Sequence, residues 1–140
     1  MSVRWTNPNV KMFLDEVRTA LRENRVTLHW SRGGYCVCPE DGEPCEGFFI
    51  KPTRKRWGKI RIATGGISNT EILHTLAHEY AHFLYWLEGD PFGNATVYKD
   101  ESFTERRALR IMESRGLPIC PTRAQALSAA YLKMLRDDEQ

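Results

Sequence analysis

The stretch TLAHEYAHFL, residues 75–84, places two histidines four positions apart, with a glutamate directly after the first. Residues four apart on an α-helix lie about 40° apart around the axis, so the imidazoles of His78 and His82 can reach one metal ion. Glu79 lies about 100° around from His78, where its carboxylate can face a metal-bound water. The stretch therefore predicts a zinc site with Glu79 as general base. Alternatively, the three are ordinary surface residues of a helix.

A catalytic zinc needs three protein ligands and one open position, so a third ligand must come from elsewhere in the chain. No histidine follows His82, which directs the search to the downstream carboxylates. On the wheel of the next expected helix, Glu105 shares a face with Ala108 and Met112. An ionised carboxylate on such an apolar stripe needs a compensating charge, which zinc would supply. Glu105 is therefore the expected third ligand.

Two alternatives to this assignment stay open. In one, Ser102 to Glu105 form a capping box in which the glutamate accepts from the backbone amide of Ser102. In the other, Glu101, one turn earlier on nearly the same face, is the fallback ligand or orients a ligating histidine. For the oxyanion of the transition state, the sequence offers three donors that would each more often be structural than catalytic: Tyr98, Tyr131 and His74.

Hydrophobic periodicity indicates which elements must position these residues. Residues 8–24 predict an amphipathic helix with Asn7 as N-cap, and residues 26–64 contain short β-type runs that we interpret as a small, mostly antiparallel sheet. The two histidines lie in the middle of a helix that begins at Ser68 or Asn69 and stops at Gly89. Helices over 101–116 and from 121 to the end complete an α+β fold with segregated helices and sheet.

Length and composition indicate the class of protein. A chain of 140 residues, with 41% hydrophobic and 27% charged residues, predicts one globular domain over 1–140. There is neither a signal-peptide core nor an apolar run of about 18 residues, so we expect a cytoplasmic protein with no membrane contact. The sequence specifies no oligomeric state.

The segment KPTRKRWGKIR, residues 51–61, is basic and contains no acid. Its cations could contact nucleic-acid phosphates while its indole stacks on a base. Alternatively, the segment is a solvated hairpin beside a peptide-binding strand. The residues of this nucleic-acid patch are Lys51, Arg54, Lys55, Arg56 and Trp57, continued by Lys59 and Arg61.

Three of the four cysteines, Cys36, Cys38 and Cys45, lie close together in the sequence. Their spacing could hold a second, structural metal, with His29 or Cys120 as fourth ligand. A C-x-C start is less diagnostic than paired C-x-x-C motifs, so we expect free, reduced thiols near a hairpin instead.

The pair HEYAH followed by a helix carrying ERRA (105–108) resembles the gluzincin zinc peptidases, whose third ligand lies in an E-x-x-A pattern. The short chain is similar to the minigluzincins, especially the ImmA/IrrE-type peptidases of phages, mobile elements and bacterial stress regulators. The resemblance covers about residues 59–116 and implies a zincin-like fold in a bacterial or phage-infected cell, with His78, His82 and Glu105 as ligands and Glu79 as base.

The same resemblance implies that KIRIAT is an edge strand on which a substrate peptide pairs antiparallel. The residues of this strand are Lys59, Ile60, Arg61, Ile62, Ala63 and Thr64. Nothing after Gly116 resembles the helix-turn-helix or sensor domains that are fused to some relatives.

These observations predict a zinc metallopeptidase that hydrolyses peptide bonds of a protein substrate. A zinc-bound water would attack the peptide, and Glu79 would act as its general base. The alternative is a non-catalytic zinc or nucleic-acid binding module that keeps the zinc site for structure.

Overall fold

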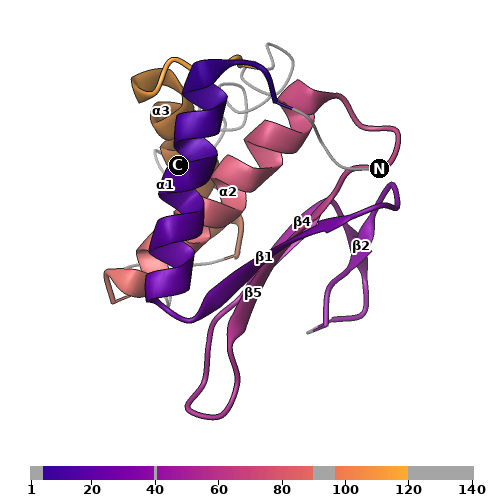
Figure 1. Cartoon of the computed structure of the whole chain (residues 1–140). Helices are drawn as coiled ribbons and strands as arrows, with labels where there is room; N and C mark the ends of the chain where they lie inside the picture. The colour runs from indigo at the N-terminus through magenta and orange to yellow at the C-terminus, as the bar shows by residue number, and fades with distance from the viewer. Residues whose placement is uncertain (1–4, 40, 90–96, 120–140) are drawn as a thin grey trace, which may run out of the picture.

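The computed structural model describes residues 5–39, 41–89 and 97–119, with side chains from Phe103 onward in the last of these ranges. This part of the chain forms three helices and five strands (Figure 1). In chain order they are α1 (Pro8–Glu23), β1 (Val26–Ser31), β2 (Cys36–Val37), β3 (Pro44–Cys45), β4 (Gly47–Ile50), β5 (Gly58–Ala63), α2 (Asn69–Leu87) and α3 (Val97–Ser114). The α+β class predicted from the sequence is confirmed.

Helix α1 begins and packs as its sequence predicts. The Asn7 side chain accepts a hydrogen bond from the backbone amide of Asn9 at 2.8 Å, and Pro8 occupies the first turn. The predicted apolar face is buried in full: Val10, Phe13, Leu14, Val17 and Leu21.

Helix α2 begins after Ser68, whose hydroxyl accepts from the amide of Glu71 at 3.3 Å, so Ser68 rather than Asn69 is the N-cap. It ends at Leu87, and Gly89 follows with a φ of 95°. The helix is buried on nearly all sides between Ile72 and Ala81. Other elements therefore cover the side of these turns that carries His74 and His78, as well as the apolar side.

The main sheet has the strand order β1-β5-β4. Strand β4 pairs antiparallel with β5, whereas β1 pairs parallel with it, so the sheet is mixed rather than mostly antiparallel. Strands β2 and β3 form a separate antiparallel pair. The prediction of an edge strand over Lys59–Thr64 is wrong, because β5 is the central strand and is hydrogen-bonded on both sides.

The helices cover one face of the main sheet (Figure 1). Helix α1 packs on β1, and α2 lies between the sheet and α3, contacting β4, β5 and α3. Ile60 and Ile62 of β5 are fully buried in the core, together with Leu73 and Phe83 of α2. The residues that alternate with these isoleucines point to the other face of the sheet.

Helix α3 starts at Val97, several residues earlier than predicted. Ser102 therefore lies inside the helix and cannot be its N-cap, so the capping-box alternative for Glu105 is wrong. The helix ends as predicted before Gly116, whose φ is 66°. The predicted C-terminal helix lies outside the described residues.

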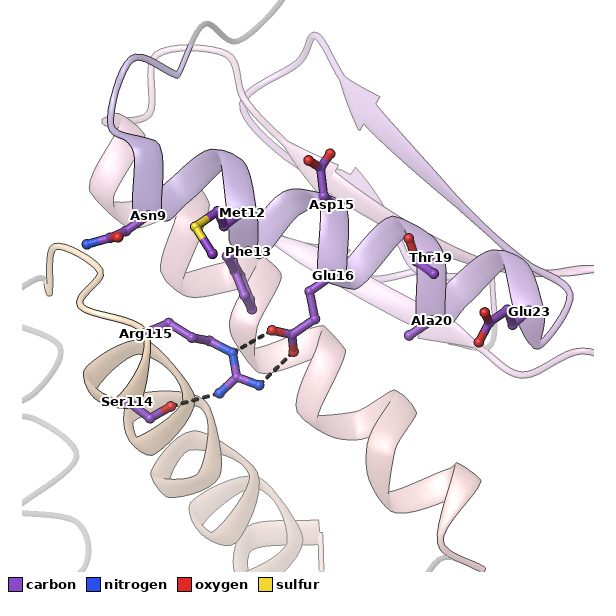
Figure 2. A pocket seen from close by; sticks show the side chains of 10 residues that line it. All are labelled: Asn9, Met12, Phe13, Asp15, Glu16, Thr19, Ala20, Glu23, Ser114 and Arg115. Carbon is purple, nitrogen blue, oxygen red and sulfur yellow. Dashed lines mark hydrogen bonds and ion pairs between the residues drawn. The ribbon is translucent and has the colours of Figure 1, made fainter.

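Two side-chain clusters fasten α3 to the other helices. Arg107 Nη1 donates to Glu88 Oε2 on α2 at 2.8 Å, and its guanidinium lies 4.6 Å from the centre of the Tyr85 ring. At the other end of α3, Arg115 donates to both carboxylate oxygens of Glu16 on α1, at 2.8 and 2.6 Å (Figure 2). The bidentate pair joins α1 to the end of α3, and both of its residues line the pocket drawn in Figure 2.

The second cluster also includes α2. The Tyr80 hydroxyl donates to Glu16 at 3.4 Å. Burial, and then the neighbouring Glu16 carboxylate, raise the pKa of Tyr80 to about 12, so its hydroxyl stays protonated as a donor.

No helix in the described ranges is long and apolar enough to cross a membrane.

Candidate metal centre

Three histidines of α2 lie one turn apart, and two of them contact one carboxylate of α3. His74 Nε2 is 3.0 Å from Glu105 Oε2, and His78 Nδ1 is 2.6 Å from Glu105 Oε1. The His78 and His82 ring centres are 4.8 Å apart, with the ring planes nearly perpendicular. The structure thus gathers the three predicted ligands, His78, His82 and Glu105, around the contact between α2 and α3.

The packing of α3 on α2 explains why Glu105 arrives at this position. Ala108 and Met112, on the same face of α3 as Glu105, are fully buried in the main core. The Arg107 pair with Glu88 holds the neighbouring flank. Sequence periodicity placed Glu105 on this buried stripe, and that placement is confirmed.

The site is enclosed. His74 is 0% exposed, His78 9% and Glu79 7%, while His82 is half-buried. The alternative in which the three motif residues are ordinary surface residues is therefore wrong for His78 and Glu79. Of the three motif residues, His82 is the one that is partly exposed.

Glu105 is ionised despite its burial. Burial raises the pKa of its carboxyl group, but the contacts with His74 and His78 outweigh this effect and hold the pKa well below its ordinary value. The charge compensation that sequence reasoning assigned to zinc is thus supplied, at least in part, by two imidazoles. The contact from His74 was not anticipated, although the spacing His74-x3-His78-x3-His82 already put all three rings on one face.

The donor set suits zinc in kind, since two imidazoles and a carboxylate are ligands that zinc uses. Among the side chains that the structure describes, however, no three of His, Cys, Asp and Glu are arranged to hold a metal ion. Both Glu105 oxygens contact histidines. To become a ligand, Glu105 would have to turn away from His74 or His78.

The observed contact also fits a different role for Glu105. A metal-binding histidine usually donates a hydrogen bond from its second ring nitrogen to a carboxylate, which orients the ring. Glu105 at His78 Nδ1 has this geometry, and His78 would then bind a metal through Nε2. In the observed conformation Glu105 can accept a hydrogen bond from His78 and so orient its ring. Glu105 can become a metal ligand only if its carboxylate turns away from a histidine.

The remaining predicted site residues divide into two groups. His74, one of the three proposed oxyanion donors, is fully buried against Glu105 and holds that carboxylate. The side chains of Glu101 and Tyr98, on the first turns of α3, lie outside the described part of the chain, as does Tyr131 entirely.

The flank of α2 that carries Glu79 faces the short strands. The Thr75 hydroxyl lies 3.5 Å from a carboxylate oxygen of Glu46, and a Cβ added at Gly47 would approach the Thr75 methyl to 3.0 Å. Burial is the main cause of the raised pKa values of the Cys36 and Cys45 thiols, and the Glu79 carboxylate adds to the increase. Glu79, the proposed base, is one turn after Thr75 and therefore lies on the flank of α2 that borders β2, β3 and the start of β4.

Among the described residues, Cys36, Cys38 and Cys45 form no disulfide. Cys36 and Cys45 are directly opposite each other in the β2–β3 pair. Burial, together with Cys36 and Cys38, raises the pKa of Cys45 to about 11. Without a metal, the Cys45 thiol therefore stays protonated at neutral pH, and the second structural metal stays an untested alternative. His29 is exposed and bonded to Thr27, and Cys120 lies outside the described residues.

A comparison of the chain with protein-family profiles, curated proteins and solved structures found no match. The resemblance to gluzincins therefore depends on the motif residues of the sequence alone.

Proposed function

We propose that the protein is a zinc-dependent metallopeptidase. The observation that carries the proposal is the pairing of His78 and His82 on a buried helix with an ionised carboxylate, Glu105, brought to His78 by a second helix. A histidine pair at this spacing needs a third anionic group to form a catalytic zinc site, and Glu105 is the candidate that lies within reach. When bound, zinc would acidify a water molecule and polarise the substrate carbonyl.

The chain's own residues would carry the proton transfers. Glu79, beside His78 and buried on the flank toward the short strands, would take a proton from the attacking water and pass it to the leaving amine. His74 would hold Glu105 in place, because its Nε2 contacts the carboxylate oxygen that does not face His78. His74 is thus a positioning residue in this proposal.

A peptide substrate would pair with β4. This strand is an edge of the main sheet and packs against α2, and no other described strand pairs with its outer side. An extended peptide can add to such an edge through backbone hydrogen bonds. This assignment replaces the central strand β5.

The test combines metal content with turnover. The purified wild-type protein, loaded with zinc and dialysed, should retain one zinc per chain by elemental analysis and cleave peptides in a mixed-sequence library read by mass spectrometry. Glu79→Gln should keep the zinc and lose cleavage by about 100-fold or more, because it removes only the base. Glu71→Gln, an exposed change on the same helix, is the matched control and should behave as wild type.

Two further variants identify the ligands. His82→Ala should lose stoichiometric zinc, whereas His29→Ala, on the exposed face of β1, should not. Cleavage that persists in Glu79→Gln, or zinc retention in His82→Ala, would overturn the proposal.

The enclosed site favours one alternative, a non-catalytic module that binds zinc for structure. His78 and Glu79 are buried, and Glu105 is already bonded to two imidazoles. In that case zinc would raise the melting temperature by binding only the folded state, but the wild type would cleave no peptide in the library.

A further inference from the structure

The loop that joins β4 to β5 carries a run of exposed cations. It projects past the helical layer at one end of the molecule (Figure 1). No acidic residue occurs anywhere between Gly47 and Thr70. The exposed cations of the loop are Lys51, Arg54, Lys55 and Arg56.

Hydrogen bonds fix the shape of this loop. The Thr53 amide donates to the Arg56 carbonyl at 2.9 Å, and the Thr53 hydroxyl accepts from the Arg56 amide at 3.1 Å. Arg25 Nη1, from the turn before β1, donates to the Thr53 carbonyl at 3.0 Å. Because the turn is closed and tied to a second segment, the cations are displayed on an ordered scaffold, which lowers the entropy cost of binding.

The four loop cations have no carboxylate partner among the described residues. The described ion pairs of other arginines, Arg107 with Glu88 and Arg115 with Glu16, use carboxylates of the helices. Unpaired like charges on one short loop repel each other, and a polyanion would relieve that repulsion.

An aromatic ring lies among these cations. Trp57 is 53% exposed, which is unusual for a large apolar side chain. Two more cations, Lys59 and Arg61, follow on β5, where they alternate with the buried Ile60 and Ile62. They therefore lie on the face of the sheet opposite the helices and extend the charged surface along the strand.

We propose that this surface, formed by Arg25, the loop cations, Trp57, Lys59 and Arg61, binds single-stranded nucleic acid. The cations would contact successive phosphates, and an unpaired base would stack on the Trp57 indole. A duplex would leave the indole unused, because its bases are already stacked. The proposal is independent of the peptidase activity, since its residues belong to the loop and strands and not to α2 or α3.

The test uses the full chain and a fluorescently labelled dT15 oligonucleotide in an anisotropy titration at several salt concentrations. Neutralising four or five phosphates should give a slope of about 3 for log Kd against log salt. The triple variant Arg54→Glu, Lys55→Glu, Arg56→Glu should lose at least about tenfold in affinity, and the slope should fall by about 2. The matched control makes the same charge change with exposed residues of α1: Lys11→Glu, Arg18→Glu and Arg22→Glu.

The stacking contribution has its own pair of variants. Trp57→Ala should weaken binding at least about fivefold, as expected for one lost base–aromatic contact. Tyr35→Ala removes another exposed aromatic ring, outside the loop, and should leave Kd unchanged. Glu79→Gln should also bind dT15 as wild type does, so a failure of the peptidase proposal would be seen separately.

Several outcomes would overturn the proposal. These are equal losses in the loop and α1 triple variants, binding that is indifferent to salt, or a Trp57→Ala variant that binds as wild type. Tighter binding to a duplex of the same length, or to vesicles of phosphatidylserine and phosphatidylcholine, would assign the surface to those partners instead.

Discussion

Charged side chains are arranged in opposite ways in two regions: they are buried and paired at the contact between α2 and α3, and exposed in the loop between β4 and β5. In the first, the Glu105 carboxylate is mostly buried and is bonded to His74 and His78. In the second, four cations are exposed and have no carboxylate partner in the described part of the chain. Charge inside the fold must be matched by partners that the fold itself provides, whereas charge outside it is matched by water and is available to another molecule. The first region should therefore control stability, and the second should control binding.

The largest expected effect of this difference is on stability, in Glu105→Ala. The variant removes the acceptor of the fully buried His74, so its Nε2 would lose a partner inside the core. We expect the free energy of unfolding to fall by about 3 kcal/mol. Urea denaturation followed by circular dichroism measures it.

The control for this prediction is Glu113→Ala, an exposed change on the same helix, which should stay within about 0.5 kcal/mol of wild type. If both variants lose the same amount, the buried contact has no special role.

A second effect concerns pH. The pKa of Glu105 is lowered in the folded protein by His74 and His78, against the effect of burial, and in the unfolded chain it returns to about 4.5. The stability contributed by its charge is therefore fully present above pH 4.5 and is lost progressively as the pH falls toward the lower folded value. Wild type should lose stability below pH 4.5 faster than Glu105→Gln, which cannot titrate at this position. Parallel acid-unfolding curves for the two proteins would show that the ionised form is not the stabilising one.

The smallest effect is expected in the other region. The triple variant Arg54→Glu, Lys55→Glu, Arg56→Glu should change the free energy of unfolding by less than about 0.5 kcal/mol, because these side chains are exposed and unpaired among the described residues. The same urea experiment measures it. A loss of 2 kcal/mol or more would mean that the loop cations support the fold, and the contrast between the two regions would fail.

The parts of the fold that depend on local signals could be predicted from the sequence. The Asn7 cap, the buried face of α1 and the limits of α2 follow from side chains within one or two turns, and all are confirmed. The order of the strands could not be predicted, because the parallel pairing of Val26 with Gly58 joins segments far apart in the sequence. Strand-type sequence patterns show which segments are extended, but not which strands pair with each other.

The candidate site shows the same division. Periodicity placed Glu105 on a buried stripe and the histidines on one face of a helix, and both placements are confirmed. Sequence reasoning did not reveal that two imidazoles would contact Glu105, since such contacts depend on how two helices pack. The start of α3 at Val97 was also missed, because the Gly-, Asn- and Asp-rich segment before it is typical of a loop.

The bond between Arg115 and Glu16 affects how the protein can fold while it is being synthesised on the ribosome. Glu16 is made early, and its partner follows 99 residues later. Helix α1 can form as soon as it emerges, but this bond cannot close until all of α3 and the residue after it have been synthesised. The His–Glu cluster obeys the same order, since Glu105 follows His78. We expect nascent chains stalled before Arg115 to be cut by protease more readily than chains that include it, because α1 then lacks its bond to the end of α3.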